Sequence, residues 1–218
     1  MAKKKLIHFT ENLSFPHLFQ PRYQDIKPCY RMKGVWGKEF FRNDHPITLE
    51  LGCGKGEYTI ELARQYPNRN FIGIDIKGAR LWRGCKTVEE DQLKNVVFIR
   101  TRADHLEQLF GPGEVSEIWI TFPDPQPGKE RKRLTAPIFL NRYQKILIPS
   151  GIVHLKTDDF DFFAYTQEII EKTKVKVLLA IEDLYSENTQ DPASQIQTYY
   201  EKIWLKQGKK ISYIKFQL

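Results

Sequence analysis

Residues 47–75 read ITLELGCGKGEYTIELARQYPNRNFIGID, and this stretch decides the fold. Segments 47–51 and 70–75 are short and rich in apolar and β-branched residues, while segment 57–66 between them has helical spacing. A strand, a helix and a second strand in this order predict a βαβ unit with two parallel strands in one sheet. Glycines at alternate positions directly after the first strand let the backbone turn sharply and approach a ligand closely. We therefore expect a binding site where the first strand ends.

The alternation of strands and helices continues along the chain. Further strands are expected at residues 96–101, 117–122, 151–156, 175–181 and 211–216. Segments with helical spacing lie between the strands, at 78–91, 136–147, 160–172 and 197–207, with a short turn near 105–110. This pattern predicts an α/β fold, a doubly wound, mostly parallel, seven-stranded Rossmann-like sheet with helices on both faces. Such sheets bind their ligands beyond the carboxyl ends of the strands, near the reversal of strand order.

Residues 1–46 do not follow this alternation, and we interpret them as a basic, partly irregular N-terminal arm before a domain of residues 47–218. Prolines interrupt any long helix in the arm, and aromatic residues such as Phe15 and Trp36 alternate with basic ones. These rings could stack on bases, but packing onto the core is the commoner use of such aromatics and is the reading we favour.

Composition excludes several classes of protein. The chain has 218 residues and 41% hydrophobic side chains, which suffices for one core without disulfides or metal. Its cysteines, Cys29, Cys53 and Cys85, form no Cys-x-x-Cys pair, so a zinc finger or disulfide scaffold is not expected and no metal is assigned. There is no signal peptide pattern and no apolar run of about 18 residues. We expect a soluble, cytoplasmic protein without a membrane partner, either a monomer or a homodimer.

The positive charge is concentrated in three stretches. Residues 1–42, 129–145 and 202–218 together carry a net charge of +16, whereas the rest of the chain carries −9. Such clustering is typical of a protein that binds a polyanion, because phosphate neutralisation releases counterions. Taken one at a time, each stretch could equally be a solvated face.

One carboxylate stands just before the glycine turn, and another ends the next strand. Glu50 precedes the turn, and Asp75 ends the second strand, where an acid can accept hydrogen bonds from both hydroxyls of a ribose. Asp75 alone fits an adenosyl group or NAD. The dinucleotide fingerprint, however, needs its third glycine at position 57, which is Glu57. The spacing therefore disfavours a nucleotide-dependent oxidoreductase.

Two more acids lie after the third and fourth strands. Asp104 could meet the exocyclic amine of an adenine ring, or it could cap a short helix that begins at His105. Asp124 stands between Pro123 and Pro125, which restrict the backbone and hold the carboxylate at the edge of the sheet. We favour a functional role for Asp124 over that of a structural loop acid.

Five segments together resemble the bacterial tRNA (guanine-N7-)-methyltransferase family, TrmB type, whose members belong to the class I S-adenosylmethionine-dependent methyltransferases. The segments are Glu50-Leu51-Gly52-Cys53-Gly54-Lys55-Gly56, Gly73-Ile74-Asp75, Phe122-Pro123-Asp124-Pro125 with a basic run ending in Lys132-Arg133-Leu134, Lys156-Thr157-Asp158, and Thr198-Tyr199-Tyr200-Glu201. The resemblance runs from residue 47 to the C-terminus. The first two segments are common to many methyltransferases, whereas the third and the last are much narrower.

The resemblance implies a tRNA modification enzyme that transfers a methyl group from S-adenosyl-L-methionine to N7 of a guanine in the variable loop, forming 7-methylguanosine. By the same resemblance the cofactor-binding residues are Glu50, Gly52, Gly54, Asp75, Asp104 and Asp124, with Asp124 also catalytic. The guanine would contact Lys129, Asp158, Thr198, Tyr199, Tyr200 and Glu201. The chain departs from the family at Gln126, where an aromatic is usual, and its basic run is shorter and has no histidine.

The chemistry of this reaction asks for positioning more than for acid–base help. Guanine N7 is a lone-pair nucleophile without a proton to remove, so an in-line geometry is the main requirement. A carboxylate such as Asp124 or Glu201 could hydrogen-bond the N1–H and the exocyclic amine, and so stabilise the positive charge that develops on the purine. The alternatives are a methyltransferase of a small molecule and a non-catalytic RNA-binding partner of a separate enzyme.

Three further patterns favour structural roles. His154, inside the fifth strand, is read as a packed core residue. The acids at 158, 159 and 161 fit the cap of the next helix better than a divalent cation site. Tyr200, Trp204 and Gln207 have helical spacing, which indicates a core stripe.

Overall fold

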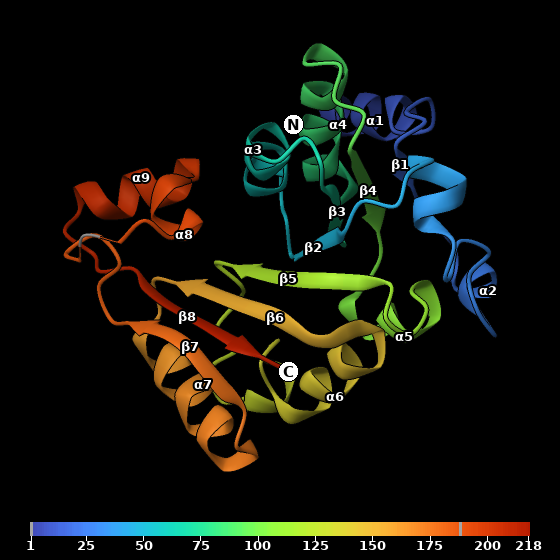
Figure 1. Ribbon diagram of the computed structural model, residues 1–218. Coiled ribbons are helices and arrows are strands. Elements are labelled where there is room, and N and C mark those ends of the chain that lie inside the picture. The colour runs from blue at the N-terminus through green and yellow to red at the C-terminus, as the bar shows by residue number, and fades with distance from the viewer. Residues whose placement is uncertain (1, 188) are drawn as a thin grey trace.

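Within residues 2–187 and 189–218, which the computed structural model describes, eight strands form one sheet in the order β1-β4-β3-β2-β5-β6-β8-β7 (Figure 1). Neighbouring strands from β1 to β6 run parallel, and β8 is antiparallel to both β6 and β7. The strands are β1 Leu18–Phe19, β2 Ile47–Leu51, β3 Asn70–Asp75, β4 Val96–Arg100, β5 Val115–Thr121, β6 Leu147–Thr157, β7 Lys176–Ile181 and β8 Ser212–Gln217.

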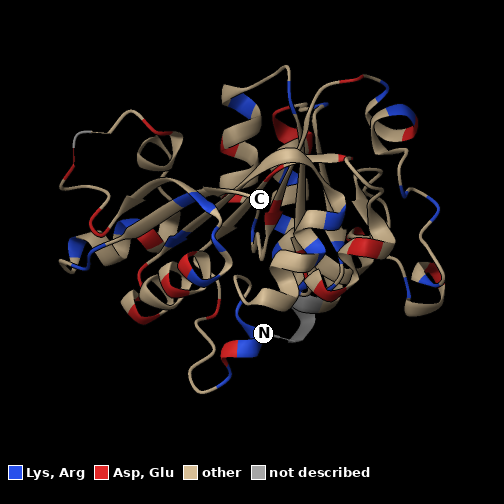
Figure 2. Ribbon diagram, turned by 60° about the horizontal axis from the view of Figure 1, so that its bottom comes forward, with Lys and Arg blue, Asp and Glu red and all other residues tan. Residues whose placement is uncertain are grey.

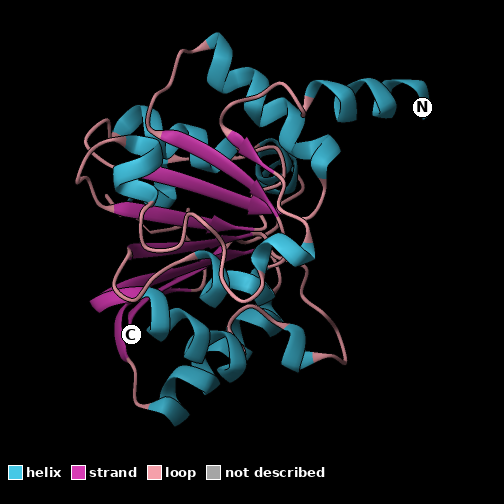
Figure 3. Cartoon of the chain, turned by 90° about the vertical axis from the view of Figure 1, so that its right-hand side faces the viewer, coloured by secondary structure: helices cyan, strands magenta, loops and turns pink. Residues whose placement is uncertain are grey.

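Helices cover both faces of the sheet (Figure 3). Side chains of the α3 face pack in one core and those of the α6 face in another. The helices are α1 Ala2–Glu11, α2 Tyr23–Ile26, a π-helix η1 Trp36–Phe41, α3 Glu57–Gln65, α4 Gly78–Glu90, a 3₁₀ turn η2 Ala103–His105, α5 Leu106–Leu109, a 3₁₀ turn η3 Glu130–Lys132, α6 Pro137–Ile146, α7 Phe160–Thr173, α8 Pro192–Gln195 and α9 Tyr199–Lys206.

The two cores follow from the period of two along each strand. In β5, Trp119 packs in the core that contains α3, α4 and α8 residues, whereas Ile118 and Ile120 pack in the core that contains α5, α6 and α7 residues. Strands buried on both faces need apolar side chains in both directions, which explains the near-continuous apolar runs of the sequence.

The strand order reverses between β2 and β5. From β2 the chain proceeds outward through β3 and β4, and then returns to place β5 on the other side of β2. The crevice beyond the carboxyl ends of these two strands is the place where a doubly wound sheet binds its ligand.

The predicted fold is confirmed, with one strand more than expected. All seven predicted strands are present, and β6 differs most because it begins at Leu147 rather than at 151. The additional strand is β1, which pairs in parallel with β4 through Leu18 and Phe98. A strand of two residues carries no recognisable period, so sequence alone does not reveal it.

The N-terminal segment is more regular than predicted, because residues 2–11 form helix α1. This helix packs on α4: the indole of Trp82 donates to Glu11 over 2.5 Å, and the ring of His8 stacks on that indole with centroids 3.8 Å apart. Asn12 adds a hydrogen bond of 2.8 Å to the carbonyl of Gly78. These partners are distant in the sequence, so local spacing could not predict the contact.

The aromatic residues of the arm mostly pack, as favoured above. Phe15 and Trp36 are buried in the two cores, and the Trp36 indole donates to the carbonyl of Leu109 over 2.9 Å. Tyr23 is the exception, with 60% of its surface exposed. Residues 2–46 thus contribute strand β1 to the sheet and side chains to the two cores.

In the described part of the chain, no helix combines the length and the apolar character that crossing a bilayer requires. Cys29, Cys53 and Cys85 are free thiols, and burial raises the pKa of Cys53 and Cys85.

Candidate functional site

The candidate site lies at one edge of the sheet, where five parallel strands end side by side. Because β4, β3, β2, β5 and β6 are neighbours and share one direction, the residues at their carboxyl ends meet at this edge. We call it the carboxylate edge, and in order across the sheet it carries Asp104, Asp75, Glu50, Asp124 and Asp158. The structure therefore brings the predicted acids of separate segments to one rim.

The glycine turn after β2 leaves open space at this edge. Gly52 and Gly54 have φ angles of +76° and +57°, and a Cβ added at either one would meet no atom within 4 Å. Gly54 N–H donates to Asp75 over 2.9 Å, so the turn is held to the end of β3. Gly56 differs, because a Cβ there would lie 2.4 Å from the ring of Phe98. The missing side chains at Gly52 and Gly54 thus leave space for a ligand, while the missing side chain at Gly56 allows Phe98 to pack in the core.

Glu50 is buried and ties three elements together. Its carboxylate accepts from the backbone N–H of Thr59 in α3 over 2.8 Å, from the Thr59 hydroxyl, and from the Thr121 hydroxyl of β5 over 2.5 Å. Burial raises the pKa of Glu50 to about 7, although these hydrogen bonds oppose the rise and the nearby Asp75 adds to it. The structure thus gives Glu50 a bracing role at the reversal of strand order, behind the glycine turn.

A small pocket adjoins the ends of β3 and β4. It has a volume of about 220 Å³ and is lined by Ile76, Thr101, Arg102 and His105, together with Arg100 and with Pro21, Tyr23 and Ile26 of the arm. Asp75 ends β3 next to this pocket, and each of its oxygens accepts one backbone N–H: Oδ1 from Lys77 over 2.7 Å and Oδ2 from Gly54 over 2.9 Å. Each oxygen therefore keeps a lone pair for a ligand.

Asp104 is not a helix cap. Helix α5 begins at Leu106, and no side chain caps its first turn. The carboxylate instead lies 3.0 Å from Arg102 Nε and 3.9 Å from Arg142 Nη1, with 39% of the side chain exposed. The capping interpretation is therefore wrong, and Asp104 is available beside the pocket.

The loop after β5 holds Asp124 in a fixed and exposed position. Asp124 Oδ1 accepts from Gln126 N–H over 3.0 Å, and the next turn is held by Arg133 Nε, which donates to the carbonyl of Pro125 over 2.9 Å. Phe122, which starts the loop, has a φ of +48° although it is bulky and precedes a proline. Such strained backbone persists only where the surroundings impose it and clusters at functional sites.

The basic run after this loop is divided between surface and core. Lys129, Arg131 and Lys132 are exposed. Arg133 is buried, with its guanidinium 5.3 Å from the ring centroid of Phe162 and 4.6 Å from that of Tyr165. In Figure 2 the charged residues lie mainly on the helices and loops that surround the sheet. Three side chains of the run are thus free to meet a polyanion.

The acids after β6 serve different purposes. Asp158 pairs with Lys209 at 2.9 Å, while Asp159 caps α7 by accepting from Phe162 N–H over 2.7 Å. Capping is thereby confirmed for Asp159. Among residues 2–187 and 189–218, no group of three or more metal-ligating side chains comes together.

The segment Thr198 to Glu201 lies at the start of α9, against the glycine turn. Thr198 and Glu201 form a capping box, and Tyr199 N–H donates to Glu57 of α3 over 2.7 Å. Tyr199 and Tyr200 are 58% and 56% exposed, which makes the predicted core stripe through Tyr200 wrong. The buried residue of α9 is Glu201, fully enclosed.

The partner of Glu201 is Lys156, a residue that was not predicted from the sequence to have a role in the site. The lysine Nζ lies 2.6 Å from Glu201 Oε1, and both side chains are 0% exposed. The Tyr185 hydroxyl also donates to Glu201 Oε1, over 2.6 Å. The available signal was a lysine two positions from His154 in a buried strand, which puts both side chains on one face of the sheet.

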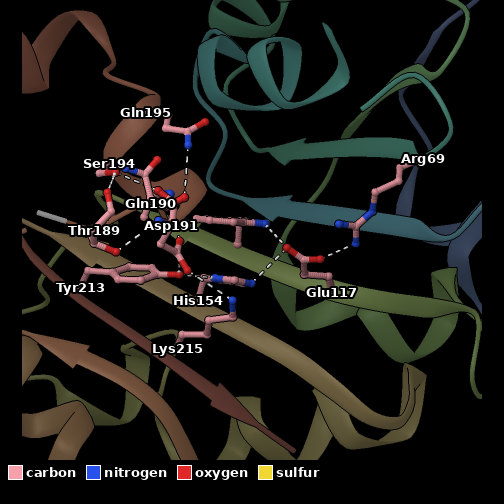
Figure 4. Close-up of polar contacts among 12 residues, drawn as sticks. Arg69, Glu117, His154, Thr189, Gln190, Asp191, Ser194, Gln195, Tyr213 and Lys215 are labelled. Atoms are coloured by element: carbon pink, nitrogen blue, oxygen red, sulfur yellow. Dashed lines mark hydrogen bonds and ion pairs between the residues drawn. The ribbon is translucent and has the colours of Figure 1, made fainter. Parts of the chain in front are cut away.

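His154 is packed in the core, as predicted, and also joins a buried polar chain (Figure 4). Its ring stacks on Trp119 with centroids 3.7 Å apart. Its Nε2 lies 3.0 Å from Glu117, which also pairs with Arg69, and its Nδ1 lies 2.7 Å from the Tyr213 hydroxyl. Although burial opposes it, the contacts with His154 and Arg69 lower the pKa of Glu117 to about 2.

The polar chain ends at the start of α8. Tyr213 donates to Asp191 over 2.9 Å, and Lys215 lies 3.2 Å from the same carboxylate. Asp191 in turn caps α8 by accepting from Ala193 N–H over 3.0 Å. The loop that leads to α8 and α9 is therefore anchored to strand β8 of the sheet.

Comparison with known proteins gives the family of the chain. Residues 44–214 match the methyltransferase family described as "Putative methyltransferase". The tRNA (guanine-N(7)-)-methyltransferase of Bacteroides thetaiotaomicron is 49% identical, over 100% of this chain and 87% of the relative. That of Christiangramia forsetii is also 49% identical, over 100% of this chain and 99% of the relative.

A solved structure supports the fold. The 16S rRNA methyltransferase KamB superposes with a TM-score of 0.65 over 85% of this chain and 94% of that protein, at 14% sequence identity. The relatives that are 49% identical over the whole of this chain confirm the resemblance drawn from the five sequence segments: the chain belongs to the tRNA (guanine-N(7)-)-methyltransferase family.

Proposed function

We propose that this protein is a tRNA methyltransferase that transfers a methyl group from S-adenosyl-L-methionine to N7 of a guanine. The observation that carries the proposal is the carboxylate edge itself: an open glycine turn beside acids from five neighbouring strands, at the reversal of strand order. The names of the full-length relatives support the same reaction and the same substrate.

The side chains at the edge fit an adenosyl cofactor with a positive charge. When bound, S-adenosyl-L-methionine supplies an electrophilic methyl group on a sulfonium. Gly52 and Gly54 leave the space for it, Asp75 would accept from the ribose hydroxyls, and the pocket beside Ile76 with Asp104 would take the adenine. No phosphate has to be bound, so the acids at this edge favour rather than oppose the ligand.

The guanine would be held by residues on the β5 and β6 side of the same edge. Asp124 is exposed near the start of its fixed loop, and Tyr199 and Tyr200 present aromatic rings from α9. Asp158 and Lys129 complete the set that we propose for the guanine. Because N7 carries no proton, the task of Asp124 is to orient the base and to stabilise the charge that develops on the purine.

Glu201 contributes to guanine binding through its position. Its carboxylate is engaged with Lys156, Tyr185 and the N–H of Thr198. We therefore propose that Glu201 fixes the first turn of α9, on which Thr198, Tyr199 and Tyr200 lie, and so places the rings that meet the base.

We propose the variable loop as the position of the guanine and the cytoplasm as the place of the reaction, with the exposed basic side chains binding the tRNA backbone. The test uses purified protein, radiolabelled S-adenosyl-L-methionine and tRNA transcripts made with guanine or with 7-deazaguanine. We expect incorporation into the first transcript only, because the second lacks the accepting atom.

Label in the deaza transcript would refute N7 as the acceptor, and no label in either would refute the activity. Borohydride and aniline cleave RNA at 7-methylguanosine, so the length of the fragments locates the modified nucleotide. Cleavage outside the variable loop would refute the proposed position.

A further inference from the structure

We propose that Lys156 is a positioning residue for guanine recognition, which holds the start of α9 in register with the carboxylate edge through its buried pair with Glu201. The inference rests on the proposed function and adds to it a residue that touches neither the cofactor nor the base.

The ammonium of Lys156 is enclosed and fully bonded. Its Nζ contacts Glu201 Oε1 at 2.6 Å and donates to the carbonyls of Ala193 and Ile196 over 2.6 and 2.8 Å. Tyr185 adds a hydroxyl acceptor at 3.2 Å. All four partners belong to residues 185–201, so a single side chain of β6 holds the segment that precedes and begins α9.

Stability alone does not account for this arrangement. Removing an ammonium and a carboxylate from water costs so much that apolar residues of the same volume often replace a buried ion pair without loss of stability. The cost is visible here, because burial lowers the pKa of Lys156 to about 8 even though Glu201 opposes the fall. The role that this inference gives to the pair of Lys156 and Glu201 is geometric, since an arrangement that separated the two groups would leave a buried charge unpaired, which is strongly disfavoured.

The geometry that Lys156 provides is that of the proposed guanine site. Lys156 immediately precedes Thr157 and Asp158 at the carboxylate edge, and its backbone carbonyl accepts from Phe122 N–H over 2.8 Å. The ring of Phe122 packs against Trp204 of α9, with centroids 5.1 Å apart. Through Phe122, Lys156 is therefore linked both to the loop that carries Asp124 and to the helix that carries the tyrosines.

Asp75 and the pocket beside Ile76, where we place the adenosyl group, lie on the β3 and β4 side of the switch point, away from these contacts. The glycine turn does meet the start of α9, where Tyr199 N–H donates to Glu57, but it is also held to β3 by the hydrogen bond from Gly54 N–H to Asp75. Loosening of α9 should therefore impair tRNA recognition while leaving cofactor binding intact, and this separation is the signature to test.

The mildest test is Tyr185→Phe, which keeps the ring but removes the hydroxyl that bonds both Lys156 and Glu201. The matched control is Tyr143→Phe: Tyr143 is buried in α6, in the core on the other face of the sheet, and its hydroxyl donates to the carbonyl of Leu134 over 2.8 Å. For Tyr185→Phe we expect the KM for tRNA to rise about 10-fold while the Kd for S-adenosylhomocysteine changes less than about 2-fold. Tyr143→Phe should leave both constants within about 2-fold of wild type.

Lys156→Met is the stronger variant, because it removes the cation that pairs with the buried Glu201 carboxylate and the donor to the carbonyls of Ala193 and Ile196. We expect it to lower kcat/KM for tRNA by about 100-fold or more at unchanged affinity for S-adenosylhomocysteine. If this variant does not fold, Tyr185→Phe still decides. An unchanged KM for tRNA in Tyr185→Phe, or a loss of S-adenosylhomocysteine affinity by the same factor, would overturn the inference. Wild-type protein that methylates no tRNA would instead refute the proposed function.

Discussion

Glu50 and Thr121 join the two strands between which the strand order reverses, through a hydrogen bond of 2.5 Å from the Thr121 hydroxyl to the Glu50 carboxylate. The bond crosses from β2 to β5 directly behind the glycine turn. This bond fixes the relative position of the two strands that flank the crevice in which a ligand of this sheet would bind. The carboxyl group that makes it is buried, so its charged form is costly.

This cost predicts how stability depends on pH. Burial raises the pKa of Glu50 to about 7, above its value in the unfolded chain, so the group favours folding at low pH and loses this effect as the pH rises through 7. A shift of this size corresponds to about 3 kcal/mol of unfolding free energy, lost between pH 4.5 and 7. Glu50→Gln cannot titrate. Denaturant unfolding at pH 5 and pH 8 should show a smaller pH effect in the variant, and an equal effect in both proteins would contradict the assignment.

A matched pair of variants separates two effects of an added side chain in the glycine turn: the loss of cofactor affinity and the loss of stability from backbone strain. Gly54→Ala and Gly113→Ala both place a side chain at positive φ, +57° and +67°, and neither Cβ would meet an atom within 4 Å. Each should lower stability by about 1 kcal/mol. Calorimetry with S-adenosylhomocysteine should show at least about 10-fold weaker binding for Gly54→Ala alone, since only there would the methyl group enter the ligand's space. Equal affinities would remove Gly54 from the cofactor site.

Asp124 should matter for turnover and not for association. Asp124→Ala removes the acceptor that orients the base, so we expect kcat to fall about 100-fold or more while the Kd for tRNA stays within about 2-fold. Asp44→Ala serves as the control, because Asp44 is exposed before the start of β2, at the opposite edge of the sheet. Single-turnover kinetics and filter binding measure the two quantities, and unchanged turnover would exclude Asp124 from the reacting centre.

The exposed part of the basic run should supply affinity that depends on salt. Reversing Lys129, Arg131 and Lys132 to Glu should weaken tRNA binding about 10-fold or more at physiological salt and make the salt dependence shallower. Reversing Lys172, Lys174 and Lys176 changes the charge by the same amount at the other edge of the sheet, where α7 ends and β7 begins. That control should bind normally. Equal losses in both variants would indicate a general effect of net charge.

Much of the fold and of the rim could be predicted because the signals are local. Strands buried on both faces carry continuous apolar runs, and acids that directly follow such strands must meet at one edge of a parallel sheet. Asp75 and Asp124 were found in this way without knowledge of any contact.

What could not be predicted depends on partners distant in the sequence. The Lys156 and Glu201 pair joins positions 45 residues apart, and the same pair inverts the expected burial of α9, where Glu201 is enclosed and Tyr200 is exposed. Helix α1 likewise depends on Trp82 of α4. Hydrophobic periodicity assigns acids to the outside, so it fails wherever a carboxylate finds a buried cation.

The wall that Pro21, Tyr23 and Ile26 provide beside Ile76 affects how the N-terminal residues can be studied. A chain shortened to begin at residue 47 would lack this wall as well as β1 and the buried ring of Trp36, so its inactivity would say nothing specific about RNA. Dissecting the segment calls for single changes on its exposed face, since the residues that precede the first glycine motif are also part of the enclosure around the adenosyl group that we propose.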